Sequence, residues 1–341
     1  MKTVPVQDAV GKMLCHDITQ IVPGFFKGRA FKKGRIIKQA DVDKLLDMGK
    51  ANIYVQDMKP GMLHEDEAAR RIAEAAAGGG LRLSEPAEGK VNLISTEKGL
   101  LSVNTDALSR INEVEDIMFA SRHTHFPVQP DMPVAGTRII PLYTDEERIQ
   151  TVEAICRHFY PLVEVKPFTP VKVGVVTTGS EIYHGRIEDK FGPVLRKKFE
   201  ELGSEVIEQR FVSDDIQMTV DAIHELIARG AEFIALTGGM SVDPDDQTPT
   251  SIRVSGARVV TYGAPVLPGA MFMLAYMGTI PVVGLPGCVM YYHASIFDLV
   301  IPRLLTGETL TKKDIAAMGH GAFCANCPDC RYPDCPFGKM G

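Results

Sequence analysis

Three turns that contain glycine each follow an apolar run in the second half of this sequence of 341 residues. Glycine lets a backbone approach a ligand closely, and the N–H groups of such turns can point at phosphate oxygens. If the three turns lie on one edge of a sheet, they predict a phosphate-binding site. The candidate residues are Thr178, Gly179, Ser180 and Glu181 in the first turn; Thr237, Gly238, Gly239, Met240 and Ser241 in the second; and Gly284, Leu285, Pro286 and Gly287 in the third.

Carboxylates follow the second turn, at Asp243, Asp245 and Asp246. Three carboxylates would repel a phosphate unless they bind Mg²⁺ or accept hydrogen bonds from an amino-bearing heterocycle. A ligand that combines phosphate with a pterin or purine edge would satisfy both the turns and the carboxylates. The alternative is that these residues cap turns and the next helix. Asp214 and Asp215 are ambiguous in the same way, because they also form a good helix start.

Four of the seven cysteines lie within the last eighteen residues, at Cys324, Cys327, Cys330 and Cys335. A segment with so little else to bury is most easily organised by a metal, whose binding would supply folding energy. The repeated two-residue spacing before a final Cys-Pro is close to the ferredoxin run, which has three residues before its last cysteine. An iron–sulfur cluster is one interpretation, a four-cysteine Zn²⁺ site is the second, and an unstructured redox tail is the third.

Between residues 167 and 307 the sequence alternates strand-like and helix-like patterns. This alternation predicts a Rossmann-like α/β domain with a doubly wound, mostly parallel sheet and helices on both faces. Ligands bind such sheets beyond the carboxyl ends of the strands, where the three glycine turns fall. The expected strands are residues 171–177, 205–212 and 231–236, with others near Val259, Phe272 and Val282; the expected helices are residues 188–202, 216–229 and about 290–305.

The preceding sequence predicts two smaller parts, residues 1–59 and an α+β part at 60–166, and residues 308–341 form the cysteine-rich tail. Alternation over residues 22–37 predicts a hairpin, which a helix at 40–48 and a strand at 53–55 follow. Six basic residues without an acid lie between Lys27 and Lys38, and they form either a solvated face or a contact for an anion or partner. In the second part we expect a helix over 64–77, a hairpin over 91–103 and a helix capped by Thr105.

Composition bears on partners and location. The net charge is only −6, so bulk charge gives no reason to expect nucleic acid. Residues 259–297 contain no Asp, Glu, Lys or Arg, but prolines and glycines cut this stretch into strand-sized pieces. We therefore expect buried strands there and no membrane span. The first residues lack a signal-peptide pattern, so we expect a cytoplasmic protein.

Four ordered motifs over about 110 residues resemble the successive signatures of the molybdopterin-binding domain family. That family includes molybdopterin adenylyltransferases, molybdopterin molybdenumtransferases and the corresponding domains of gephyrin. Residues 10–14 and 31–34 also resemble the start of the molybdenumtransferase branch, similar to the gephyrin E domain, though less specifically. The motifs are Thr178-Gly179-Ser180-Glu181; Ser213-Asp214-Asp215; Thr237-Gly238-Gly239-Met240-Ser241 with Asp246-Gln247-Thr248-Pro249; and Gly284-Leu285-Pro286-Gly287.

The resemblance implies a ligand, a reaction and roles for residues. Molybdopterin or adenylated molybdopterin would be the ligand, and molybdate would be inserted at the dithiolene sulfurs with loss of AMP. Asp246 and Asp243 would contact Mg²⁺ or the pterin, and Asp214 or Asp215 would assist. The ligand would also contact the Gly238–Gly239 loop and Thr248, and the turn from Gly284 to Gly287 would shape the pocket floor.

Two of the departures from the family pattern lie among or beside the candidate site residues. The turn at Pro268 and Gly269, included among the ligand-binding candidates, has Leu267 and Ala270 where family members usually carry lysines, and Cys288 replaces an asparagine. A non-catalytic carrier that delivers molybdopterin or finished cofactor to a molybdoenzyme is therefore the second interpretation. A nucleotide-pyrophosphate hydrolase of the competence-damage protein type is the third. The resemblance also implies a homodimer.

Overall fold

The computed structural model describes residues 2–22, 25–55 and 61–339, and these residues form two compact units. Unit 1 contains residues 1–95, 104–121 and 131–164, and unit 2 contains residues 96–103, 122–130 and 165–341. The junction expected near residues 59 and 60 lies outside the described residues. The division into segments 1–59, 60–166, 167–307 and 308–341 stays a prediction.

Unit 1 begins with short antiparallel pairs and continues as a four-stranded sheet in the order β6-β7-β11-β9. Helix α2 carries alanines and Ile72 on one buried face and contacts the sheet and helix α4. Its elements are β1 (Lys2–Pro5), η1 (Val6–Ala9), β2 (Ile18–Val22), β3 (Phe26–Phe31), α1 (Gln39–Asp47), β4 (Asn52–Val55), β5 (Met62–His64), α2 (Glu65–Ala76), β6 (Leu81–Leu83), β7 (Lys90–Ser95), α3 (Thr105–Asn112), β9 (Ile117–Ser121), β11 (Pro133–Ile139), β12 (Tyr143–Asp145) and α4 (Glu146–His158).

Three expectations for the first half need correction. The N-terminal hairpin is β2 paired with β3, so it begins earlier than residue 22 and ends before residue 37. Residues 23 and 24 lie outside the described residues. The cap of α3 is Asn104, whose side chain accepts the Ala107 amide, and not Thr105. The expected 91–103 hairpin is wrong: β7 lies in the four-stranded sheet, whereas β8 (Gly99–Val103) lies in a different sheet. Pairing with strands distant in sequence outweighed the local turn.

Unit 2 is built on a six-stranded sheet in the order β15-β14-β16-β19-β18-β17. The first four strands are parallel, and β18 and β17 complete the sheet through antiparallel pairs. The predicted doubly wound, mostly parallel fold is thereby confirmed. The strands are β14 (Lys172–Thr178), β15 (Glu205–Val212), β16 (Phe233–Thr237), β17 (Arg258–Tyr262), β18 (Met273–Met277) and β19 (Ile280–Leu285), and a three-stranded sheet of β10 (Pro127–Val128), β8 and β13 (Val163–Pro167) accompanies them.

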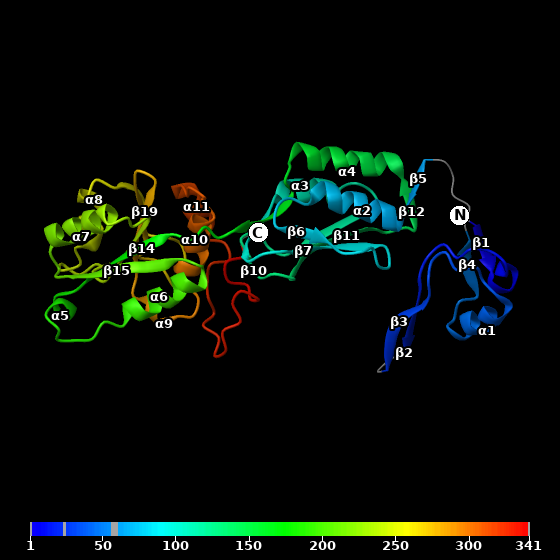
Figure 1. Cartoon of the computed structure of the whole chain (residues 1–341), viewed down its shortest axis with the longest axis horizontal. Helices are drawn as coiled ribbons and strands as arrows, with labels where there is room; N and C mark the ends of the chain where they lie inside the picture. Colours follow the sequence, from blue (N-terminus) through cyan, green and yellow to red (C-terminus); the bar gives the residue numbers. More distant parts are fainter. Residues whose placement is uncertain (1, 23–24, 56–60, 340–341) are drawn as a thin grey trace. The chain divides into compact units, whose positions relative to one another are not determined.

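Helices cover both faces of this sheet because successive strand residues point to opposite sides. In β14, Val175 packs in one buried cluster with α6 (Phe191–Glu201) and α10 (Ile296–Leu305), whereas Val176 packs in the other with α7 (Ile216–Ala228) and α8 (Thr248–Val254). Figure 1 shows α7 and α8 on one side of the sheet and α6 on the other. The remaining helices are α5 (Ser180–Tyr183), α9 (Cys288–Tyr291) and α11 (Lys312–Ala317).

The long helix expected over about 290–305 is two helices, α9 and α10. The break falls at Tyr292, and α10 restarts where Ser295 and Asp298 form a capping box. Uniform hydrophobicity hid this start, since a buried helix shows no polar face. No helix among the described residues is long and apolar enough to cross a membrane.

Candidate functional site

The three glycine turns leave adjacent parallel strands at the same edge of the sheet. Thr177 of β14 pairs with Thr237 of β16, and Thr237 pairs with Leu285 of β19. All three strands run in one direction, so the turns that follow them lie side by side. The edge that sequence analysis selected for ligand binding is therefore one continuous edge.

The second turn crosses directly over the end of β14, and two glycines permit this. Gly238 has φ +84°, and a Cβ there would lie 2.1 Å from the carbonyl oxygen of Thr178. Gly239 has φ +54°, and a Cβ there would lie 2.9 Å from the Thr248 hydroxyl. A side chain at Gly238 would both strain the backbone and displace the neighbouring strand end.

A buried threonine network joins the first and second turns. The Thr248 hydroxyl donates to the Gly238 carbonyl at 2.8 Å, and the Thr178 and Thr248 hydroxyl oxygens lie 3.0 Å apart. The Thr237 hydroxyl is buried and has no hydrogen-bond partner among the described residues. Buried polar atoms are normally satisfied, so this hydroxyl is an exception.

The first turn is held by the loop that precedes α7. The Asp214 carboxylate accepts the Ser180 amide at 2.9 Å, and the Ser180 and Ser213 hydroxyls lie 2.8 Å apart. Asp215 is the N-cap of α7 and accepts the Met218 amide at 2.8 Å. The helix-start interpretation thus holds for Asp215, while Asp214 orders the first turn. Glu181 is exposed on α5.

The acidic loop folds into a turn closed by its own members. The Asp246 carboxylate accepts the Asp243 amide at 3.2 Å, and the Asp246 amide donates to the Asp243 carbonyl at 2.9 Å. Asp243 and Asp245 are exposed and Asp246 is half-buried. One Asp246 oxygen is therefore occupied within the loop, and the other groups face solvent.

Tyr262 lies against this loop and was not among the residues selected from sequence. Its hydroxyl donates to the Met240 carbonyl at 3.0 Å and lies 3.3 Å from the Ser241 carbonyl. Burial raises the pKa of Tyr262, against the opposing effect of Arg253, whose guanidinium lies 5.4 Å from the ring centroid. The available signal was its place as the last residue of a strand that ends at this edge.

Several candidate residues serve the core. Met240 is 4% exposed, and a Cβ on Gly284 would lie 2.6 Å from its sulfur, so this side chain fills the space that Gly284 leaves. Leu285 is also fully buried. These residues shape the edge from beneath.

A separate cavity of about 430 Å³ is lined by the Pro268–Gly269 turn and by the end of the third glycine turn. Gly269 packs against α10, where a Cβ would lie 2.4 Å from the Ile296 Cβ, and Gly287 is the N-cap of α9. Burial raises the pKa of Cys288, so its thiol is protonated at neutral pH. The cavity is lined by Leu267, Pro268, Gly269, Ala270, Met271, Pro286, Cys288, Tyr292, Cys324 and Asn326.

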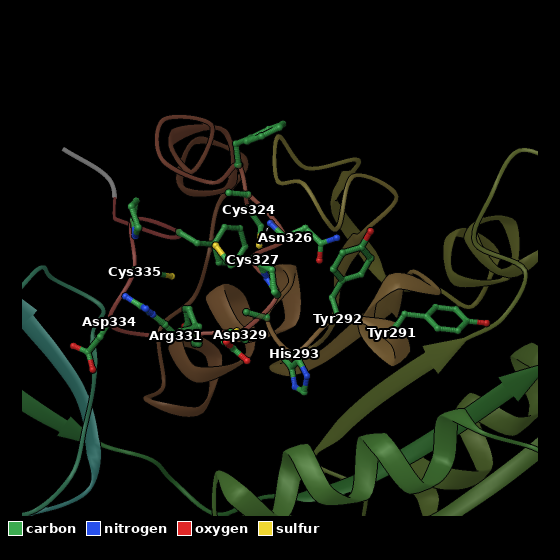
Figure 2. A pocket seen from close by; sticks show the side chains of 18 residues that line it. Tyr291, Tyr292, His293, Cys324, Asn326, Cys327, Asp329, Arg331, Asp334 and Cys335 are labelled. Atoms are coloured by element: carbon green, nitrogen blue, oxygen red, sulfur yellow. Dashed lines mark hydrogen bonds between the residues drawn. The ribbon is translucent and has the colours of Figure 1, made fainter.

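The cysteine tail lies beside this cavity, but its thiols are not gathered as metal ligands. Among residues 2–22, 25–55 and 61–339, no three His, Cys, Asp or Glu side chains are placed to hold a metal ion. Cys324 and Cys335 are partly buried against the domain, whereas Cys327 and Cys330 are exposed. Figure 2 shows the side chains that line a different cavity, among them Cys324, Cys327 and Cys335 of the tail together with Tyr291, Tyr292 and His293.

Residues 174–306 match the family model described as a probable molybdopterin binding domain. The resemblance drawn from the four motifs is confirmed for this segment, which is the sheet and helices of unit 2 up to the end of α10. A second model, described as a domain of unknown function, matches residues 3–57.

Individual relatives agree with this class. The molybdopterin molybdenumtransferase of Staphylococcus aureus (strain COL) is 28% identical over 135 residues, which cover 38% of this chain and 32% of the relative. The molybdopterin adenylyltransferase of Pyrococcus furiosus is 30% identical over 92 residues, 27% of this chain and 54% of that protein. The chain thus spans about a third of the length of the molybdenumtransferases that it matches.

Among solved structures, the molybdopterin biosynthesis enzyme MoaB of Thermus thermophilus is 19% identical with a TM-score of 0.33, covering 40% of this chain and 98% of its own. The tungsten cofactor synthesizing protein MoaB of Pyrococcus furiosus is 23% identical with a TM-score of 0.31, covering 35% and 84%. The strand order of the six-stranded sheet carries the fold assignment.

Proposed function

We propose that unit 2 binds molybdopterin or its adenylated form at the edge formed by the first two glycine turns, and that the protein acts in molybdenum cofactor biosynthesis. The observation that carries the proposal is the match of residues 174–306 to the molybdopterin-binding model, on a strand edge with two closely crossed glycine turns.

The proposed reaction is insertion of molybdate with release of AMP. Mg²⁺ usually takes one or two carboxylates and completes its coordination with substrate phosphates. Asp246 and Asp243 would supply the two carboxylates, and the phosphates of the ligand would complete the coordination of Mg²⁺. Their place in a largely exposed loop leaves room for both the ion and the ligand. Bound Mg²⁺ would offset charge on the cleaved phosphoanhydride. Asp215, as a helix cap, is proposed to act by holding α7 rather than by chemistry.

Incubation of the full chain with adenylated molybdopterin, Mg²⁺ and molybdate, followed by chromatography of AMP, tests this reaction. Asp246→Asn keeps an acceptor for the Asp243 amide but removes the charge, and we expect at least about a tenfold loss of molybdate-dependent AMP release. Asp245→Asn in the same loop is the matched control and should retain the rate. AMP release without molybdate would support the hydrolase instead and contradict the transferase.

A carrier without catalysis is the second candidate, and the Pro268–Gly269 turn favours it. Cations suited to phosphate or molybdate are absent from this turn, and its cavity is lined by Leu267, Ala270 and the protonated Cys288. Tight molybdopterin binding by calorimetry, with no AMP formed, would support the carrier and reject the transferase. As a carrier, the protein would deliver the cofactor to a recipient molybdoenzyme. We also propose that it is a homodimer and that it is located in the cytoplasm.

The tail completes the proposal as a metal-binding element, with an iron–sulfur cluster or Zn²⁺ at its four cysteines. The support is the spacing of the thiols and the scarcity of other groups to bury around Cys327 and Cys330.

A further inference from the structure

The beginning of the chain forms a small module with a core of its own. Its buried cluster contains only residues between Val4 and Val55, and residues 3–57 match a family model separate from that of unit 2. Residues 2–22 and 25–55 are called the N-terminal module below. A set of polar contacts joins this module to the rest of unit 1, and the buried side chain of His64 lies at their centre.

His64 is in contact with two different loops of the module. Its Nε2 atom lies 2.8 Å from the Cys15 carbonyl oxygen, and its Nδ1 atom lies 2.9 Å from the Lys33 Nζ atom. The two loops are tied to each other, since the Gly34 amide donates to the Leu14 carbonyl at 2.9 Å. A single side chain at the end of β5 therefore binds both loops at once.

The partners of His64 decide where its hydrogen lies. The Lys33 ammonium and the Asp66 amide, which lies 3.1 Å from Nδ1, can only donate, so Nδ1 must accept. The Cys15 carbonyl can only accept, so Nε2 must carry the hydrogen. His64 therefore makes all three contacts only as the neutral ring with a hydrogen on Nε2.

The surroundings also favour the neutral ring. Burial lowers the pKa of His64, and Lys33 lowers it further, against the opposing effects of the Cys15 carbonyl, Asp66 and Asp17. Burial likewise lowers the pKa of the neighbouring His16. The titratable and charged groups around His64 come from every element packed there, namely Cys15, His16 and Asp17 before β2, Lys33 after β3, Glu65 and Asp66 on α2, Arg138 on β11 beside Glu65, and Tyr143 on β12.

Protonation of Nδ1 would turn this acceptor into a donor. It would place an N–H and a positive charge against the Lys33 ammonium, which lies only 2.9 Å away. The Asp66 carboxylate lies 3.6 Å from Nδ1 and 3.0 Å from Lys33, so the charged ring would compete with Lys33 for it. His64 belongs to α2 as its N-cap, whereas Lys33 is exposed and can turn to solvent. The contact that is lost is therefore the one to the module.

We propose that neutral His64 holds the N-terminal module against β5, α2 and β12, and that protonation of its Nδ1 atom releases the module. The contact is at full strength above the ordinary histidine pKa of about 6.5. It weakens as the pH falls below this value, because His64 takes up a proton more readily in the released state than in the bound state. The proposal concerns unit 1 alone and does not rest on the proposed function of unit 2.

Chemical labelling of Cys15 in the full chain tests this release. Cys15 is 4% exposed and its thiol forms a hydrogen bond with Tyr143 of β12, so release of the module should make it accessible. Cys156 is fully buried in α4 of the same unit and reports unfolding of the whole unit. Both labelling rates are measured with dithiodipyridine, which reacts with thiols in mild acid, and mass spectrometry. We expect the rate at Cys15, relative to Cys156, to rise severalfold between about pH 7.5 and about pH 5.5.

Three variants assign this rise to His64. His64→Gln keeps a donor and an acceptor but does not titrate, so its Cys15 rate should not change with pH. His224→Gln, at an exposed position on α7, is the matched control and should keep the rise. Lys33→Gln should move the midpoint to higher pH, because Lys33 lowers the pKa of His64. The proposal is overturned by a flat rate in the unmodified chain, a rise that survives in His64→Gln, an unchanged midpoint in Lys33→Gln, or a parallel rise at Cys156.

The position of the hydrogen gives a second test, which needs no folded His64 variant. Long-range proton–nitrogen NMR spectra of the unmodified chain at neutral pH distinguish the two neutral rings from the charged one. The signal of His64 is the one that shifts in Lys33→Gln, since the Lys33 Nζ atom is in contact with this ring. We expect a hydrogen on Nε2 alone. A hydrogen on Nδ1, in either the neutral or the charged ring, would overturn the proposal.

Discussion

The glycine-turn edge and the cysteine tail are the two candidate sites of unit 2, and their residues are held in opposite ways. At the edge, Thr178 and Thr248 are buried and tied to each other and to the Gly238 carbonyl, although Glu181, Asp243 and Asp245 are exposed. In the tail, Cys327 and Cys330 are exposed between two anchored ends. The first candidate site is formed by packing, whereas the second has two thiols that packing does not hold. Substitutions at the edge should therefore change stability, and substitutions in the tail should change only what the tail binds.

Gly238→Ala should give the largest effect. The added Cβ meets the Thr178 carbonyl at 2.1 Å on a backbone with φ +84°, so we expect a loss of about 3 kcal/mol or more in denaturant unfolding. Gly256→Ala is the control that separates backbone strain from steric overlap. Gly256 has φ +88°, but a Cβ there would have no atom within 4 Å. Its expected cost is about 1 kcal/mol. Equal losses for the two variants would show that the close crossing is unimportant.

Thr248→Val should come next. Valine keeps the shape but leaves the Gly238 carbonyl and the Thr178 hydroxyl without this partner, at an expected cost of about 1–3 kcal/mol. Thr250→Val, half-buried on the same helix, serves as the control and should change the unfolding free energy by under about 0.5 kcal/mol. A ligand that uses this network should also bind the Thr248 variant more weakly, as calorimetry would reveal.

Asp215 distinguishes capping from chemistry at the same edge. Asp215→Ala removes the acceptor for the Met218 amide and should cost about 1 kcal/mol, whereas Asp215→Asn should cost almost nothing. Normal AMP release by the asparagine variant would identify the residue as a cap. A large loss of rate while stability is kept would instead support the assisting role that the family resemblance implies for Asp215.

Cys327→Ser should have the smallest effect on the fold. The side chain is exposed, so the metal-free chain should unfold within about 0.5 kcal/mol of the unmodified one. Removal of bound metal by a chelator should lower the melting temperature of the unmodified protein and leave that of the variant unchanged. Destabilisation of the metal-free variant would mean that the thiol contributes to packing after all.

The sequence by itself determined the alternation of strands and helices in unit 2 and the edge where its glycine turns meet. Both follow from local signals, since buried parallel strands are continuously apolar and glycines mark the turns that end them. For Asp215 the sequence left a helix start and a functional role open, and in the structure it caps α7.

Tertiary structure decided where local signals conflict or are silent. The sequence between β7 and β8 looks like a hairpin turn. In the structure, however, β7 pairs with β6 and β11, and β8 pairs with β10 and β13. Met240 belongs to a motif that predicts ligand binding. Its side chain is nevertheless part of the core, because it fills the space left by the missing side chain of Gly284. The pairing of Leu267 with Cys324 joins residues far apart in sequence. Such contacts depend on which surfaces meet when the chain closes on itself, and no local pattern contains that information.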